Sequence, residues 1–301
     1  MVFIMRFILD YNANNIFILG AGASVDYGLP TWLELKDLII KKISSSDGYQ
    51  YKKEILEWLS YVGNDKKYRT VDECIKHESI TYHENGHKIE DELFRVIKDV
   101  FDDLYKENQK GWIRLFNDKI KSSSNLMHQS IAFINYNYDN VLDLNLLNFS
   151  HLSAKEREIN DSDALRILAN VEIPVLRPHG QFDTEKFLHT NSRVDTNKTG
   201  KDDYIDVVSC YESKKHEVVF RDSRNIISNN KFNLYILGLG GGLSVNLNNI
   251  DFKGLISEIN ITIKDGKNND AVSDFLVERF KIDKENIKIF SDCEELIDKC
   301  F

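Results

Sequence analysis

Short apolar runs recur along the chain, and longer stretches with apolar residues three or four positions apart separate them. Continuous apolar runs are typical of strands buried on both faces of a parallel sheet, whereas the wider spacing is typical of helices with one buried face. The alternation of the two patterns predicts an α/β fold with a Rossmann-like, mostly parallel sheet flanked by helices. The predicted strands are 16–19, 131–134, 173–176, 234–237, 259–263 and 287–290.

Helical patterns fill the chain between the first two predicted strands. Thr31 and Glu34 have the spacing of a capping box, which predicts the start of a helix whose apolar face includes Leu35, Leu38 and Ile39. We interpret residues 44–125 as a helical insertion within a single domain spanning residues 1–301, because no linker-like stretch interrupts the chain. Within and after this insertion, helices are predicted near residues 51–62, 70–78, 90–108, 153–170, 270–280 and 292–298.

The first predicted strand ends in Gly20-Ala21-Gly22-Ala23-Ser24. A Gly-x-Gly turn after a buried strand lets backbone N–H groups approach a phosphate, although glycines also serve ordinary tight turns. The fingerprint of hydride-transfer enzymes needs a third glycine where this chain has Val25, and an acidic residue near the end of a second strand about 20 residues later. Both are missing, so the turn indicates a nucleotide site and argues against a dehydrogenase.

Polar residues also follow two later strands, at the edge where open α/β sheets bind ligands. Asn137 and Asp139 come directly after the second predicted strand, and an Asx turn is the alternative explanation for them. His179 is held between a proline and a glycine after the third, where a histidine can act as a general base near neutral pH. A purely structural histidine is the alternative there.

A second glycine-rich segment follows the predicted strand 234–237. It contains Gly238, Gly240 and Ser244, and it permits another close approach of the backbone to a ribose or an adenine. A flexible loop explains the same residues equally well.

Composition narrows the function classes. The net charge of −9 argues against a protein that binds nucleic acid through its phosphates, since that binding depends on Lys and Arg. The 4 cysteines form no C-x-x-C pair, and Gly86 interrupts the histidines at 77, 83 and 87, so we expect neither zinc nor another metal. The start of the chain lacks the features of a signal peptide, and no stretch approaches the roughly 20 apolar residues of a membrane span. We therefore expect a cytoplasmic protein without direct contact to membranes.

Taken in order, these motifs resemble the sirtuin-like family, in particular its zinc-free branch of NAD hydrolases in bacterial anti-phage defence. The matching pieces are the glycine turn with Gly28-Leu29-Pro30, then Asn137-Tyr138-Asp139, His179-Gly180 and the late glycine segment. More weakly, Ile259-Asn260 and residues 291–294 are similar to the elements that line the adenosine end of the site. The paired cysteines of deacylating sirtuins are missing, as is an acidic residue at the Thr31-Trp32 position.

The resemblance implies a role for each matching residue. Ala21, Gly22 and Ser24 would hold the NAD pyrophosphate, and the NAD site would also be lined by Gly20, Pro30, Thr31, Gly238, Gly240 and Ser244. Asn137 would hold the nicotinamide ribose and the attacking water, Asp139 would order the nicotinamide pocket, and His179 would act as the base on the ribose hydroxyls. An oxocarbenium-like ribose needs a positioned water and electron-rich oxygens instead of a metal, which agrees with these roles.

The sequence-based hypothesis is therefore an NAD hydrolase that releases nicotinamide and ADP-ribose, uses NAD as a substrate and needs no cofactor. The resemblance implies the toxic effector of an abortive-infection system, activated by a signal or a partner defence protein, and a homo-oligomer. A non-enzymatic sensor of NAD or a nucleotide signal is the alternative, and an ADP-ribosyltransferase or deacylase is a weaker one.

Overall fold

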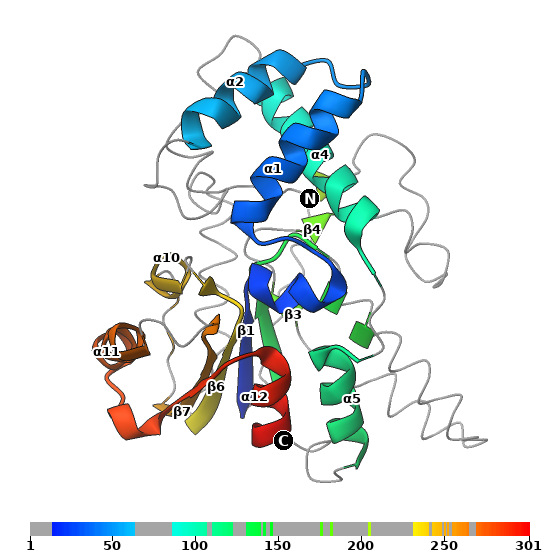
Figure 1. Ribbon diagram of the computed structural model, residues 1–301. Coiled ribbons are helices and arrows are strands. Elements are labelled where there is room, and N and C mark those ends of the chain that lie inside the picture. Colours follow the sequence, from blue (N-terminus) through cyan, green and yellow to red (C-terminus); the bar gives the residue numbers. More distant parts are fainter. Residues whose placement is uncertain are drawn as a thin grey trace, which may run out of the picture.

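The structure of the protein is a computed structural model (Figure 1). It describes residues 14–63, 86–106, 110–122, 131–139, 141–142, 145–146, 175–176, 181–182, 204–205, 231–240, 243–248, 250, 252, 255–264 and 269–301.

A parallel sheet of six strands forms the centre of the molecule, with the strand order β3-β2-β1-β6-β7-β8. The first strand, β1, lies in the middle of the sheet. The strands β2 and β3 extend the sheet on one side of β1, and β6, β7 and β8 extend it on the other side. This is the strand order of dinucleotide-binding Rossmann folds, and ligands bind where the order reverses, which here lies between β1 and β6. The predicted fold class is confirmed. The strands are β1 (Asn15–Leu19), β2 (Ile131–Asn135), β3 (Val175–Leu176), β6 (Lys231–Leu237), β7 (Leu255–Thr262) and β8 (Ile287–Phe290).

Helices cover both faces of this sheet (Figure 1). Ile16 and Ile18 of β1 belong to the core beneath α10 (Leu243–Asn248) and α11 (Asn269–Phe280). Phe17 points the other way, toward α5 (Trp112–Ser122) and α12 (Cys293–Cys300). Its ring stacks on Phe133 and Tyr235 with centroids 4.9 and 4.7 Å away. Burial on both faces explains why the central strand β1 carries a continuous apolar run, residues 16–19.

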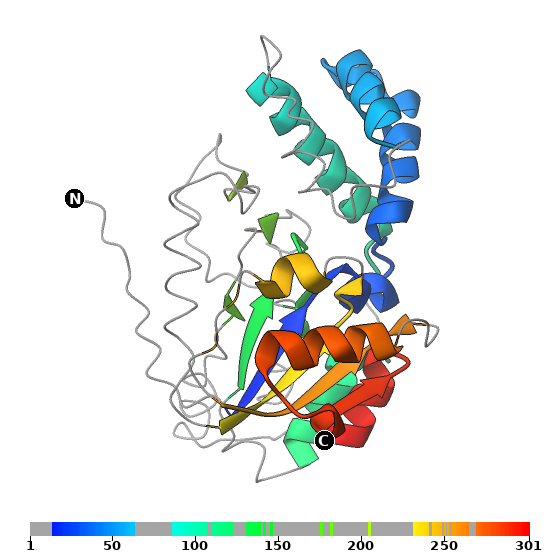
Figure 2. The ribbon, with the colours of Figure 1, turned by 90° about the vertical axis from the view of Figure 1, so that its left-hand side faces the viewer.

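Three helices form a lobe beyond the carboxyl ends of the strands (Figure 2). This helical lobe consists of α1 (Trp32–Ser45), α2 (Lys52–Gly63) and α4 (Gly86–Leu104), and it has a hydrophobic core of its own. Tyr138, which follows β2, joins that core and meets Phe94 edge to face at 6.2 Å. The bounds of this lobe differ from those of the predicted helical insertion, residues 44–125. Helix α1 begins before residue 44 and belongs to the lobe, whereas α5 lies within 44–125 and packs on the sheet.

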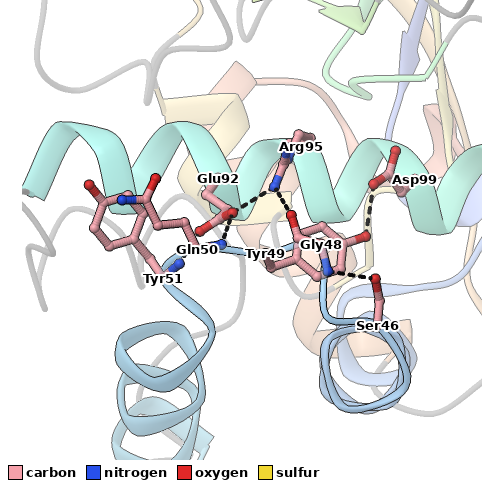
Figure 3. A network of polar contacts seen from close by, with 8 residues as sticks. All are labelled: Ser46, Gly48, Tyr49, Gln50, Tyr51, Glu92, Arg95 and Asp99. Atoms are coloured by element: carbon pink, nitrogen blue, oxygen red, sulfur yellow. Dashed lines mark hydrogen bonds and ion pairs between the residues drawn. The ribbon is translucent and has the colours of Figure 1, made fainter.

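A buried carboxylate fixes the turn between α1 and α2 (Figure 3). Glu92 of α4 is 7% exposed, and its oxygens accept the backbone N–H of Gln50, at 2.6 Å, and that of Tyr51. Arg95 pairs with the same carboxylate at 2.6 Å and also donates to the carbonyl of Gly48. The charge of Glu92 is thus compensated by a cation and by two N–H donors that precede α2.

The remaining elements differ from the sequence prediction mainly at their ends. The helix predicted at 90–108 is Gly86–Leu104, and the glycine-rich segment after β6 leads into α10, which was not predicted. A small antiparallel pair, β4 (Gln181–Phe182) with β5 (Tyr204–Ile205), was also not predicted. The helices predicted at 70–78 and 153–170 lie outside the described residues.

The Glu92 network makes a prediction about stability. Glu92→Gln removes the charge that compensates Arg95 and one of the two strong acceptors, and we expect it to lower the free energy of unfolding by about 2 kcal/mol. Urea denaturation followed by circular dichroism measures this loss. Glu57→Gln is the control, because Glu57 is 69% exposed in its pair with Lys53 and should change stability by under about 0.5 kcal/mol. Equal losses in the two variants would contradict the assigned role.

Candidate functional site

Glycines bring the carboxyl ends of β1 and β6 into direct backbone contact. The N–H of Gly20 donates to the carbonyl of Leu237, and that of Gly22 to the carbonyl of Gly238, both at 2.9 Å. A Cβ on Gly238 would lie 2.1 Å from the backbone N of Ala23, a distance that no side chain can adopt, and its φ is +65°. The glycines after β1 and β6 are therefore required by the packing of one strand end on the other.

This packing decides which parts of the glycine turn face outward. The N–H of Gly22 is engaged with β6, so it is not the donor that the sequence suggested for a phosphate. Ala21 and Gly240 are exposed at the same edge, and the space around a Cβ on Gly240 is open to 4 Å. Ala21 and Gly240 thus form the exposed surface of the turn.

The glycine turn continues directly into a short 3-10 helix, η1 (Ala21–Tyr27). It ends at Gly28, whose left-handed φ of +84° brings its Cα close to the carbonyl of Leu104. Pro30 is buried, and Thr31 begins α1 with the predicted capping box, its N–H and hydroxyl both donating to Glu34 at 2.8 Å. Pro30 and Thr31 thus have a structural role at the start of α1.

Ser24, Asn137 and Asp139 meet where η1 passes over the end of β2. The hydroxyl of Ser24 donates to Oδ2 of Asp139 at 2.8 Å and accepts Nδ2 of Asn137 at 3.1 Å. The same Nδ2 donates to the carbonyl of Gly20 at 2.9 Å, which fixes which end of the amide is nitrogen. Both amide hydrogens of Asn137 are used, and no described residue donates to its Oδ1.

The Asx-turn alternative is right for Asp139 and wrong for Asn137. Oδ1 of Asp139 accepts the N–H of Val141 at 3.0 Å, two residues on, while its other oxygen reaches Ser24. The side chain of Asn137 instead crosses to η1, and the turn at that position is made by Asn135, whose Oδ1 accepts the N–H of Asn137. One carboxylate therefore both shapes the loop and ties it to η1.

The cluster is closed in this structure. Ser24 is 4% exposed, and Asn137 and Asp139 are each 7% exposed. The interior that they line with Trp112 and Asn135 has no room for a water molecule. Ser24 is thus a link between the two side chains and is not placed as a nucleophile, because a substrate cannot reach its hydroxyl.

Other predicted residues fall in different places. His179 lies outside the described residues, three positions after β3 in the sequence, and Ser244 is half-buried in α10. The prediction for Asn260 is wrong, because this side chain is fully buried within β7, where its amide contacts Glu258 and Cys300. Strand periodicity does not reveal how far along a strand a residue lies from the ligand-binding edge.

Three residues at this edge were missed by the sequence analysis. Trp112 donates its indole N–H to the carbonyl of Ala23 at 2.7 Å, and Thr262 accepts the N–H of Gly238 at 2.9 Å. Asn135 supports the loop as described above. Of these, Thr262 and Asn135 end their strands and could have been found by the strand-end rule, whereas nothing in the local pattern singles out Trp112.

Carboxylates accumulate beside η1. Burial, and then the charge of Asp292, raise the pKa of Asp26, and burial followed by Asp26 and Asp292 raises the pKa of Glu294. This negative rim repels an anion from the side of η1 that faces α12. Cys293 lies between Asp292 and Glu294 in the sequence. Burial raises the pKa of its thiol to about 12, so the thiol stays protonated at neutral pH and is a poor nucleophile.

No protein-family model matches the chain, and no curated protein matches its sequence. Among the described residues, no group of three or more His, Cys, Asp or Glu is arranged to hold a metal ion. Within the same parts of the chain, no helix is both long and apolar enough to cross a membrane.

The contact between strand ends predicts a large difference between two glycines. Gly238→Ala forces a Cβ into the backbone of η1 as well as a left-handed backbone, and we expect a loss of more than about 3 kcal/mol in unfolding free energy. Gly240→Ala is the matched control, because it has the left-handed φ of +48° and open space, and should cost about 1 kcal/mol. Similar urea midpoints for the two variants would contradict the packing described.

The raised pKa of Asp26 predicts how stability depends on pH. Because its pKa in the folded state lies above the ordinary value of 3.8, ionisation of Asp26 opposes folding at neutral pH, and this penalty is lost as the pH falls through the raised pKa. Asp26→Asn should therefore raise the urea midpoint at pH 7 and have little effect below the ordinary pKa.

Asp298→Asn is the control of opposite sign. A hydrogen bond from Lys119 lowers the pKa of Asp298, so its ionised form favours folding above the ordinary pKa and this contribution is lost as the pH falls. The variant should lower the midpoint at pH 7. An Asp26→Asn midpoint at or below that of the parent at pH 7 would refute the assignment.

Proposed function

We propose that the protein is an NAD hydrolase that releases nicotinamide and ADP-ribose. The observation that carries the proposal is the position of Ser24, Asn137 and Asp139, which meet at the carboxyl ends of β1 and β2, beside the point where the strand order reverses. That point is where Rossmann folds bind dinucleotides. Two of the motifs that resemble the zinc-free sirtuin-like hydrolases, the glycine turn and Asn137-Tyr138-Asp139, fall on these strand ends.

Asn137 is suited to the chemistry of the nicotinamide ribose. Breaking the glycosidic bond builds positive charge on the ribose, so a fixed oxygen acceptor that holds a hydroxyl or a water is stabilising there. Both hydrogens of the Asn137 amide are held by Gly20 and Ser24, which orients its Oδ1 without using it. Asp139 keeps that arrangement through Ser24, so it is assigned the ordering of the pocket.

His179 is proposed as the base that acts on the ribose hydroxyls. It follows β3 in the sequence, and β3 pairs with β2, whose end carries Asn137. Imidazole titrates near neutral pH, so a neutral histidine can accept a proton from a hydroxyl there.

The pyrophosphate is assigned to the exposed surface of Ala21 and Gly240. The backbone N–H groups of Gly20 and Gly22 are engaged with β6, and the acidic rim of Asp26 and Asp292 disfavours an anion on the other side of η1. Ser244 lies in α10, which follows the glycine segment after β6, and Thr262 is the last residue of β7 at the same edge. These two residues are the candidates for the adenosine half.

The proposal extends to a cellular role. The closed cluster is the form expected of an enzyme that stays inactive until a signal, a partner defence protein or self-assembly opens its site, as in an abortive-infection effector in the cytoplasm. The same closure supports a second candidate, a sensor that binds NAD or a related nucleotide without cleaving it, because the cluster has no room for an attacking water.

Nicotinamide release from NAD tests the two candidates. Purified protein should release little nicotinamide alone and much more with lysate from phage-infected cells. Asn137→Ala and His179→Ala should each lower the activated rate by roughly a hundredfold or more. Asn248→Ala, on the exposed end of α10, is the control and should match the parent. Parent-like rates in both site variants would refute the catalytic assignment. Saturable NAD binding without nicotinamide release under both conditions would favour the sensor.

A further inference from the structure

The helix η1 carries Ser24, yet little within η1 fixes its own position. It has the tight 3-10 geometry, whose hydrogen bonds are weaker than those of an α-helix, and no side chain caps its start. Its start is tied to β6 through Gly22. Besides the hydrogen bonds of Ser24 with Asp139 and Asn137, η1 is held by contacts from the chain between the end of α4 and the start of α5, more than seventy residues away in the sequence.

Several contacts from that polypeptide hold η1. The indole N–H of Trp112, the first residue of α5, donates to the carbonyl of Ala23 at 2.7 Å. The N–H of Lys106 donates to the carbonyl of Tyr27 at 2.9 Å, and the N–H of Ile113 donates to the hydroxyl of Tyr27 at 3.2 Å. We call these residues, 106 and 111–113, the η1 clamp.

The clamp requires a close approach. A Cβ on Gly111 would lie 2.7 Å from the hydroxyl of Tyr27, so a larger residue at this position would push the tyrosine away. Trp112 is 1% exposed and lines the same closed interior as Ser24, Asn137 and Asp139. Because the indole is buried and its single N–H is bonded to the carbonyl of Ala23, the residue before Ser24, its position is fixed.

The hydrogen bonds of Ser24 depend on the position of η1 to within a few tenths of an ångström. Its contacts with Asp139 and Asn137 are 2.8 and 3.1 Å, and hydrogen bonds lose most of their strength when stretched by more than about half an ångström. If Asn137 loses its bond to Ser24, only the carbonyl of Gly20 is left to orient the amide that carries Oδ1. A change in the position of Trp112 therefore affects Asn137 through Ala23 and Ser24.

We propose that Trp112 is a positioning residue of the Ser24–Asn137–Asp139 cluster, and that the η1 clamp links the helical lobe to the reaction site. The clamp begins two residues after α4 ends, so a displacement of α4 changes the position of η1 directly. In this role Trp112 acts through the backbone of η1, by its bond to the carbonyl of Ala23. As regards the reaction itself, the inference rests on the proposed NAD hydrolysis.

Trp112→Phe tests the inference, because it keeps an aromatic ring in the core and removes the N–H donor. Amide hydrogen exchange of the peptide 20–28, measured by mass spectrometry, should be roughly tenfold faster in this variant. Tyr49→Phe is the control, since it removes the bond from Tyr49 to Asp99, 2.8 Å long, within the helical lobe and away from η1. It should leave exchange of that peptide unchanged. Equal exchange in parent and Trp112→Phe overturns the proposal.

Kinetics provide the second measurement. Trp112→Phe should lower kcat for nicotinamide release by roughly tenfold or more and leave KM within about twofold, because misplacing the group that orients the water affects the transition state more than NAD binding. Gly111→Ala, which displaces Tyr27 without altering Trp112, should show the same split, and Tyr49→Phe should keep the parent values. A loss of stability with unchanged kcat in both clamp variants would overturn the proposal.

The two proposals fail in different ways. A parent protein that releases no nicotinamide even with the lysate from phage-infected cells refutes NAD hydrolysis, and the exchange measurement alone then decides whether Trp112 positions the cluster. A parent that hydrolyses NAD while both clamp variants match it in exchange and kcat refutes the positioning role and leaves the hydrolase standing.

Discussion

The backbone contact between Gly22 and Gly238 is the constraint on which the rest of the ligand-binding edge depends. The parallel strands β1 and β6 end side by side, and the backbone must turn after each of them without a side chain in between. That contact fixes where η1 begins and so brings Ser24 over the end of β2. It also leaves Ala21 and Gly240 as the exposed surface of the turn. A glycine motif that suggests phosphate binding is here first a device for packing two strand ends.

Much of the fold could be predicted because burial on both faces leaves a simple signal. In β1, residues 16–19 form an uninterrupted, fully buried apolar run, and the capping box at Thr31 has a fixed spacing. The rule that polar residues at strand ends meet at one edge placed Asn137, Asp139 and Ser24 together. It did not place Asn260, because register along a strand is set by its neighbours and by the covering helix α12.

The residues that escaped prediction make contacts over long sequence distances. Trp112 and Ala23 are 89 positions apart, and their hydrogen bond exists only because α5 and η1 pack against the same end of the sheet. Glu92 similarly accepts the backbone N–H of Tyr51, in a turn 41 residues earlier. Local periodicity identifies a helix and its buried face, but it holds no information about which backbone group a buried tryptophan or glutamate will meet.

Tyr138 is flanked by Asn137 and Asp139, yet its ring belongs to the core of the helical lobe. Three consecutive residues thus join the polar cluster to the hydrophobic core of the lobe, so the lobe cannot unfold separately without pulling on the loop that holds the cluster. Lobe and sheet are thereby expected to unfold as one cooperative unit. By mass action, a ligand that binds the cluster then stabilises helices that it never touches, and whatever grips those helices changes the affinity for that ligand by the same factor.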